Sequence, residues 1–167
     1  MRSLSQFLAD YGDSHQNPTN QWIHIVCVPL IFVSTLALLW LVPVGNWLRL
    51  DGSLAYWVNG ATVAGVLAGI VYLRLGLRAF VLMAAWLALS VLAITGIISA
   101  GWSLLWISVA VWVIAWIIQV VGHRIEGKKP SFLEDLVFLL IGPIFVSVEL
   151  ARKLGLSVPH PHGPSDI

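Results

Sequence analysis

The sequence predicts an all-α protein, a polytopic bundle of membrane-spanning helices, and three observations support this prediction. Of the 167 residues, 59% are apolar and 10% are charged, whereas soluble domains carry about one quarter charged residues. No Asp, Glu, Lys or Arg occurs within residues 14–48, 52–73 or 79–123. The single cysteine excludes a disulfide framework, and the net charge of +1 gives no case for nucleic acid binding. Residues 1–167 are therefore expected to form one membrane domain in contact with lipid.

Four spans are expected, because a spanning helix needs about 20 apolar residues. The first two charge-free intervals each hold one candidate span. The third interval is long enough for two, which Ser99–Ser103 would separate. The predicted spans are about residues 23–42, 54–73, 79–98 and 104–121.

Two shorter helical segments and a tail flank the spans. Leu4, Phe7, Leu8 and Tyr11 recur at helical spacing, which predicts a short N-terminal amphipathic helix at the membrane surface. Residues 132–151 contain an apolar stretch of only 13 residues, 136–148, with Gly142-Pro143 at its centre. That length favours a re-entrant or interfacial helix pair over a full crossing. Residues 156–167 are expected to form a flexible tail.

The basic residues predict the orientation of the bundle. With four spans, the loops on one side hold only Arg49, and the other side holds Arg2, Arg74, Arg78, Arg124, Lys128 and Lys129. The positive-inside rule then places the N-terminus and the end of the last span in the cytoplasm. The short loops favour a bacterial inner membrane, with the endoplasmic reticulum as the alternative. The oligomeric state is not predicted.

Three histidines converge if four spans lie between the ends of the bundle. His15 lies just before the first span, His24 lies at its start, and His123 ends the fourth. Asn17-Pro18 is typical of a helix start, and Gly127 with Pro130 would end a helix that runs past residue 121. All three imidazoles should therefore meet at the cytoplasmic membrane interface.

Three further polar side chains lie on the same helix faces. Asn20 stands four residues before His24, and Gln119, His123 and Glu126 are spaced i, i+4 and i+7. Asn20, Gln119 and Glu126 could orient the imidazoles by accepting their N–H groups, and Glu126 is also a candidate catalytic group. Alternatively, Glu126 pairs with its basic neighbours.

Neutral imidazole is a good ligand for iron, copper, nickel and zinc, and open histidine-rich sites suit Fe(II) enzymes that use oxygen. His15, His24 and His123 are thus the candidate metal ligands. A fourth ligand stays open among Glu126, His160, His162 and water. Interfacial histidines also bind headgroups or cap helices, so a structural role for each is the alternative.

Two motifs carry a resemblance to a known family. The first comprises Tyr11, the run His15-Gln-Asn-Pro-Thr-Asn-Gln-Trp-Ile-His24, and Val28-Pro29. The second comprises Gln119-Val-Val-Gly-His123, Glu126 and Pro130, followed by Gly142-Pro143 and Glu149. In this order and about 100 residues apart, they resemble the signatures of the Mpo1-like family, formerly a domain of unknown function.

The resemblance implies an Fe(II)-dependent dioxygenase of fatty acid α-oxidation, with His15, His24 and His123 as metal ligands. Its substrates would be a 2-hydroxy fatty acid and O₂, and its products CO₂ and a fatty acid one carbon shorter. The 2-hydroxyl and carboxylate oxygens would bind the iron beside O₂. Two other classes remain open: a non-catalytic metal- or lipid-binding membrane protein, and a small transporter or scaffold.

Overall fold

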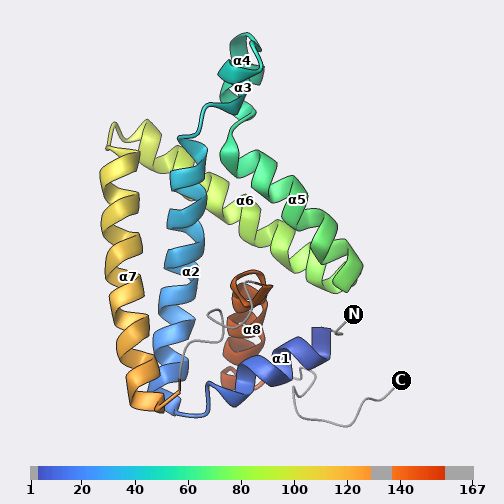
Figure 1. Ribbon diagram of the computed structural model, residues 1–167, viewed down its shortest axis with the longest axis vertical. Helices are drawn as coiled ribbons and strands as arrows, with labels where there is room; N and C mark the ends of the chain where they lie inside the picture. Colours follow the sequence, from blue (N-terminus) through green and yellow to red (C-terminus); the bar gives the residue numbers. More distant parts are fainter. Residues whose placement is uncertain (1–3, 129–136, 157–167) are drawn as a thin grey trace. The chain divides into compact units, whose positions relative to one another are not determined.

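The computed structural model of the chain describes residues 4–128 and 137–156. Within these ranges the chain forms eight helices and no strand, so the all-α prediction is confirmed for this part (Figure 1). The helices are α1 (Leu4–Asp13), α2 (Pro18–Trp40), α3 (Val44–Trp47), α4 (Gly52–Trp57), α5 (Gly60–Leu75), α6 (Leu77–Ser99), α7 (Leu104–Glu126) and α8 (Val137–Lys153). The predicted tail, apart from residue 156, lies outside the described residues, together with His160 and His162.

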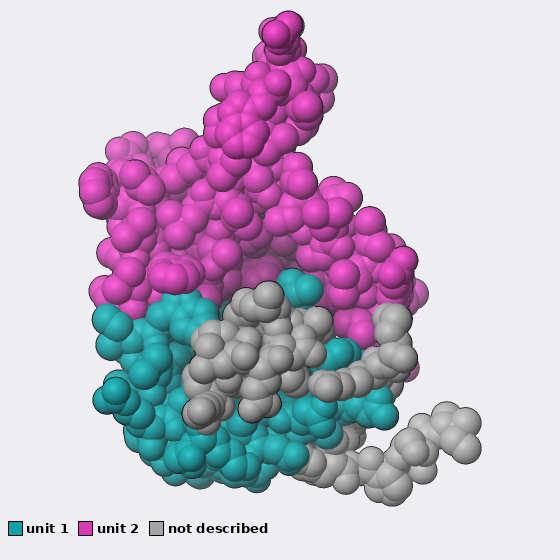
Figure 2. Space-filling view, viewed as in Figure 1, with its two compact units in different colours: residues 1–29, 115–167 teal, residues 30–114 magenta. Residues whose placement is uncertain are grey.

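The chain divides into two compact units, coloured separately in Figure 2. Unit 1 combines residues 1–29 with residues 115–167, and unit 2 comprises residues 30–114. The three candidate histidines all belong to unit 1. Each unit has its own buried apolar cluster.

In unit 1, α1 packs against α8. Phe7, Leu8 and Tyr11 of α1 contact an apolar cluster that includes Val28 of α2 and Phe145 of α8. The amphipathic helix predicted at the N-terminus is thus present. Its apolar stripe faces other helices of the unit, where burial of apolar area stabilises the fold.

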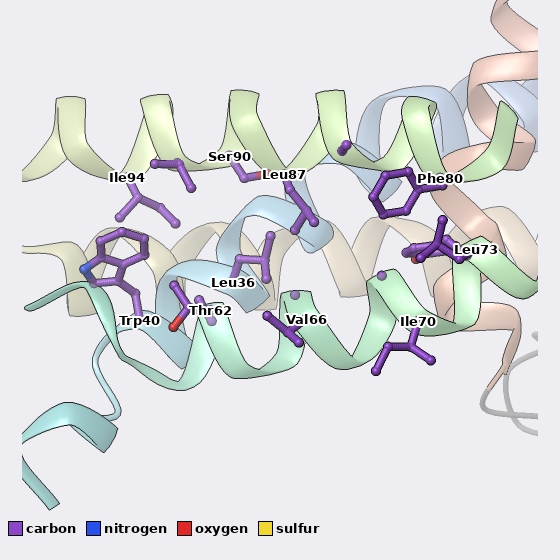
Figure 3. Close-up of a pocket in the computed structure, with 16 residues that line it drawn as sticks. Leu36, Trp40, Thr62, Val66, Ile70, Leu73, Phe80, Leu87, Ser90 and Ile94 are labelled. Carbon is purple, nitrogen blue, oxygen red and sulfur yellow. The ribbon is translucent and has the colours of Figure 1, made fainter. Parts of the chain in front are cut away.

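In unit 2, α5 and α6 lie side by side (Figure 1). Gly76 joins them with a φ of +123°, a conformation that glycine adopts much more readily than other residues. Leu36 and Trp40 of α2 pack with Ala61 of α5 and Ile94 of α6 in the buried cluster. Beside this cluster, residues of α2, α5 and α6 line a cavity of about 550 Å³ (Figure 3).

Three helical segments of the described chain are long and apolar enough to cross a membrane: Pro18–Trp47, Leu77–Ser99 and Leu104–Glu126. They contain three of the four predicted spans. Large apolar side chains on them are exposed, such as Leu92 at 67% and Trp106 at 71%, as expected of helices that contact lipid. The described chain therefore has three segments that could cross a membrane, which indicates a membrane protein, and one shorter apolar helix, α5.

The span predicted over residues 54–73 is interrupted. α4 ends at Trp57, and α5 begins at Gly60 and has only 16 residues. Asn59 causes the break, because its Oδ1 accepts the backbone N–H groups of Ala61 and Thr62 at 3.0 and 3.2 Å. In return the Thr62 hydroxyl accepts the N–H of Asn59 at 3.0 Å, which completes a capping box.

Replacing Asn59 by alanine is expected to lower the free energy of unfolding by about 1 kcal/mol, because two donors at the start of α5 lose their acceptor. Denaturant unfolding in detergent micelles measures this loss. The matched control is Asn46→Ala, since Asn46 is exposed on α3. Equal stability of the two variants would contradict a capping role for Asn59.

The predicted helix ends are otherwise close to those observed. α2 begins at Pro18, and the N–H of Thr19 donates to Asn17 Oδ1 at 2.9 Å, as expected of an asparagine N-cap. α6 ends at Ser99 and α7 begins at Leu104, which confirms the predicted separation. α7 continues to Glu126 and stops at Gly127, whose φ is +74°.

The prediction of a helix pair over residues 132–151 is wrong for the residues that the structure describes. α8 is one helix from Val137 to Lys153, and it continues through Pro143. Residues 132–136 lie outside the described part. Proline is tolerated because Ile141, Pro143 and Phe145 are all buried, so packing stabilises a helix that the Gly-Pro step alone would break.

Candidate metal centre

Three buried imidazoles meet in unit 1. His15 lies in the loop after α1, His24 lies in the second turn of α2, and His123 lies in the last turn of α7. Their side chains are only 2%, 1% and 6% exposed, respectively. One ligand nitrogen from each ring lies within 4.8 Å of the others. The predicted convergence of these histidines is thus confirmed.

The three rings are nearly perpendicular to one another. The centroids of His15 and His24 are 4.2 Å apart at 82°, and those of His15 and His123 are 5.1 Å apart at 74°. The His24 and His123 centroids are 4.9 Å apart at 84°. Imidazoles from three directions therefore surround one small volume, as ligands of a single ion do.

Backbone carbonyls determine which nitrogen of two rings carries the proton. His15 Nδ1 lies 2.6 Å from the carbonyl oxygen of Tyr11, and His24 Nδ1 lies 3.0 Å from that of Asn20. A carbonyl oxygen only accepts, so each Nδ1 carries the hydrogen and donates it. The lone pair of each neutral ring is consequently on Nε2, and metal-binding histidines commonly show this arrangement.

Two buried imidazole nitrogens lack a hydrogen-bond partner in the described structure: His15 Nε2 and His123 Nδ1. Buried polar atoms are almost always paired, because an unpaired one costs about 1–3 kcal/mol. Both atoms belong to the three-histidine cluster. A metal ion held there would be the missing partner, and the set of three neutral imidazoles suits a transition metal.

Burial keeps the His15 ring neutral. The pKa of His15 is lowered from 6.5 to about 4, mainly because burial desolvates the ring; the hydrogen bond to the Tyr11 carbonyl acts in the opposite direction, and the nearby His123 ring makes a smaller lowering contribution. The ring is therefore uncharged at neutral pH and available as a ligand.

The carboxylate of Glu126 binds the loop before α2. Its Oε1 accepts the backbone N–H of Gln16 at 2.8 Å, and its Oε2 accepts that of Asn17 at 2.9 Å. Oε2 also accepts a hydrogen bond from Nδ2 of Asn20 at 3.0 Å. Both oxygens are therefore engaged, and Glu126 joins the end of α7 to the segment between His15 and His24.

Asn20 is fully buried beside α7. Its amide nitrogen bonds Glu126, and a Cβ on Gly122 would collide with its Oδ1. The same Cβ would lie 3.2 and 3.3 Å from two carbon atoms of Ile23. Gly122 thus lets α7 approach α2 closely enough to bring His123 to the other two rings.

The sequence predicted that the side chains of Asn20 and Gln119 orient the imidazoles by accepting their N–H groups. For His15 and His24 the structure shows other acceptors. Backbone carbonyls, and not the Asn20 and Gln119 side chains, accept the ring N–H groups of His15 and His24. Gln119 is buried one turn before His123. Lys128 donates to the carbonyl oxygen of Asp13 at 2.6 Å and so also connects α7 to the end of α1.

Tyr11 is a site residue whose role the sequence did not reveal. Its ring stacks on His15 with centroids 4.3 Å apart and planes 7° apart, while its carbonyl accepts the Nδ1–H of the same histidine. The i, i+4 spacing of Tyr11 and His15 was the available signal. Burial raises the pKa of the phenol, so Tyr11 stays protonated.

A comparison with protein families places the chain among known proteins. The family described as 2-hydroxy-palmitic acid dioxygenase Mpo1-like matches residues 1–154, which include all three histidines and both motifs. The chain belongs to the Mpo1-like family. No curated protein and no solved structure matches it.

In this Mpo1-like chain the family description is consistent with a metal ion held by the three histidines. The family description names a dioxygenase, and enzymes that activate oxygen commonly use metal ions with open coordination positions. His15, His24 and His123 could hold such an ion through three nitrogens. Three protein ligands would leave positions for substrate.

Proposed function

We propose that this Mpo1-like protein is an Fe(II)-dependent dioxygenase that cleaves the C1–C2 bond of 2-hydroxy fatty acids. The observation that carries the proposal is the buried cluster of His15, His24 and His123, in which two ring nitrogens lack partners. A structural cluster would satisfy its buried nitrogens with protein partners, and this one does not. The family description supports the substrate class.

The proposed reaction balances with O₂ as the only oxidant. One 2-hydroxy acid and one O₂ give CO₂, water and a fatty acid one carbon shorter. The C1–C2 bond breaks, C2 is oxidised from an alcohol to a carboxyl carbon, C1 leaves as CO₂, and O₂ is reduced. Bound Fe(II) would supply the redox chemistry of this reaction.

In this proposal the protein's own residues bind the metal ion, orient the ligand rings and shield the site from water. The ring nitrogens of His15, His24 and His123 would hold the ion, and the carbonyls of Tyr11 and Asn20 keep two rings in the correct tautomer. Tyr11 and Phe145 cover His15, with centroids 4.3 and 5.4 Å from it, and exclude water. The basic residues at the end of α7 support a cytoplasmic location of the centre.

We infer that Glu126 is a positioning residue. Its carboxylate binds the backbone of Gln16 and Asn17, and it is absent from the group of described side chains that could share an ion. Glu126→Ala is expected to weaken iron binding by about 10–100-fold, because partners that orient ligands contribute this much to metal affinity. Competition with a calibrated chelator measures the affinity.

Glu126→Gln separates positioning from ligation. A glutamine can still accept from one backbone N–H, so its iron affinity should lie between those of the wild type and Glu126→Ala. Asp51→Asn, which changes an exposed carboxylate in unit 2, is the matched control and should bind iron like the wild type. Iron binding by Glu126→Ala equal to that of the wild type would contradict the positioning role.

Oxygen uptake by the iron-loaded protein tests the proposed activity. With 2-hydroxypalmitate we expect O₂ consumption together with a stoichiometric amount of pentadecanoic acid. Palmitate, which lacks the 2-hydroxyl, is the control substrate and should not be consumed. Iron binding without turnover of any 2-hydroxy acid would contradict the proposed dioxygenase activity and favour a non-catalytic metal-binding protein.

A further inference from the structure

Of the three candidate metal ligands, His15 alone lies outside a helix. α1 ends at Asp13 and α2 begins at Pro18, so His15 belongs to the short segment that joins them (Figure 1). His24 and His123 lie within helices, where a ladder of backbone hydrogen bonds fixes each residue. A connecting segment opens more easily than a helix unless other contacts hold it. The position of His15 therefore depends on the contacts that its segment makes.

Gln21 of α2 binds the backbone of His15. Its Nε2 donates to the carbonyl oxygen of His15 at 2.9 Å. The ring of the same residue is held separately, because its Nδ1 donates to the carbonyl oxygen of Tyr11 at 2.6 Å. Gln21 therefore fixes the backbone from which this imidazole projects.

Lys153, the last residue of α8, binds the other end of the Gln21 amide. Its Nζ donates to Oε1 of Gln21 at 2.9 Å. An amide accepts at its oxygen while it donates from its nitrogen, so the two contacts exist together and fix the direction of the side chain. A bond from a charged ammonium is also stronger than one between neutral groups. Lys153 and Gln21 thus form a continuous link from α8 to the backbone of His15.

Two neighbouring side chains restrain Lys153. Its Nζ lies 3.7 Å from Oε1 of Glu149, one turn earlier on α8, and 5.3 Å from the ring centroid of Trp22. The Lys153 side chain is 23% exposed, and that of Glu149 is 6% exposed. A fully exposed pair of this kind is screened by water and contributes little, whereas partial burial strengthens it. The ammonium is therefore held where it can bind Gln21.

The adjacent Arg152 differs from Lys153 in one respect. Its Nη1 donates to Oε2 of Glu149 at 3.2 Å, so both cations pair with the same carboxylate. Among the described residues, only Lys153 donates to Gln21. Arg152 thus offers a comparison in which a cation of α8 is removed and the link to His15 is kept.

We propose that Gln21 and Lys153 are positioning residues that hold His15 for metal binding, with Lys153 acting through Gln21. In this arrangement α8 contributes to the centre without supplying a ligand to it. The inference rests on the proposed role of His15 as a metal ligand. It adds α8 to the elements that determine the metal affinity.

Lys153→Met removes the ammonium and keeps an apolar stem. We expect Co(II) affinity to fall by about three- to tenfold, the equilibrium effect of one hydrogen bond of ordinary strength. Competition with a calibrated chelator measures this affinity. Lys153→Arg keeps a charged donor and should restore most of it. Arg152→Met is the matched control and should bind Co(II) like the wild type.

Gln21→Glu separates the positioning of His15 from the joining of two helices. Its carboxylate still accepts from Lys153, but it has no hydrogen to donate to the carbonyl of His15. We expect Co(II) affinity to fall at least as far as in Lys153→Met, and the visible absorption bands of bound Co(II) to shift as its ligands move. A link that only joins α2 to α8 would leave both unchanged. Wild-type affinity and bands in Gln21→Glu would therefore overturn the proposal.

Hydrogen–deuterium exchange of the metal-free protein tests the same link without an ion. Lys153→Met should speed the exchange of backbone amides in residues 14–17, and Arg152→Met should not. Unchanged exchange together with unchanged Co(II) affinity in Lys153→Met would overturn the positioning role and leave the metal centre intact. A wild-type protein that binds neither Co(II) nor Fe(II) would overturn the centre, and this role with it.

Discussion

His24→Ala is expected to abolish iron binding. The side chain is 1% exposed at the centre of the cluster, and its removal leaves two imidazoles that bind an ion far more weakly. Loss of a residue that only orients a ligand costs about 10–100-fold, so loss of a ligand should cost more than about 100-fold. Metal analysis after anaerobic iron loading measures the bound iron, and oxygen uptake with 2-hydroxypalmitate should disappear in parallel.

Ser34→Ala is the matched control for this variant. Ser34 is another buried polar residue of α2, and its hydroxyl donates to the carbonyl oxygen of Leu30 within the same helix at 2.6 Å. Its replacement should leave iron binding unchanged. His123→Ala should behave like His24→Ala. Wild-type iron content in both histidine variants would contradict the metal centre.

Gly122→Ala is expected to disrupt the centre without removing a ligand. The new methyl group would collide with the Asn20 side chain and lie 3.2 Å from a carbon atom of Ile23, so either the Asn20 amide turns away from Glu126 or α7 moves away from α2. Overpacking of this kind costs about 1–3 kcal/mol of folding free energy. Loss of the Asn20 contact removes a hydrogen bond of Glu126, and movement of α7 displaces His123, so iron affinity should fall together with stability in either case.

Gly96→Ala is the matched control, because Gly96 lies inside α6 and an added Cβ would have no neighbour within 4 Å. This change should be neutral or stabilise the protein by about 0.5–1 kcal/mol, since alanine is the better helix former. If Gly122→Ala bound iron as tightly as Gly96→Ala, close contact between α2 and α7 would not be needed for the centre.

The convergence of the three histidines was predictable from the sequence. The charge-free intervals define long helices, and counting spans places His15, His24 and His123 near one end of the bundle. The count of four is not required, because the described contacts bring the start of α2 to the end of α7 directly. The Gly122–Asn20 contact is one such approach.

The orientation of the rings was not predictable. Backbone carbonyls accept from His15 and His24, and residue types carry no signal for a carbonyl. The spacing of Glu126 from His123 indicates only that both lie on one face of a helix. The sequence therefore left open whether Glu126 is a ligand or a partner of nearby cations. Its hydrogen bonds to Gln16 and Asn17 depend on tertiary contacts between segments about 110 residues apart in sequence.

Two departures from the predicted fold have local physical causes. Hydrophobicity alone cannot detect the interruption before α5, where the Asn59 side chain competes for backbone donors within an apolar segment. At Pro143 the opposite holds, because the local signal for a break is real and burial of α8 overrides it. The cavity of unit 2 depends on the contact of three helices and had no signature beyond scattered glycines.

Anomalous X-ray scattering at the iron edge, from crystals of the anaerobically loaded wild-type protein, tests the three-histidine centre most directly. We expect one strong peak per chain, bonded to one ring nitrogen each of His15, His24 and His123 at about 2.1 Å, close to the bond length of other divalent metals with imidazole. An absent peak, or one bound by other residues while the three rings remain in contact, would contradict a metal centre built from these histidines.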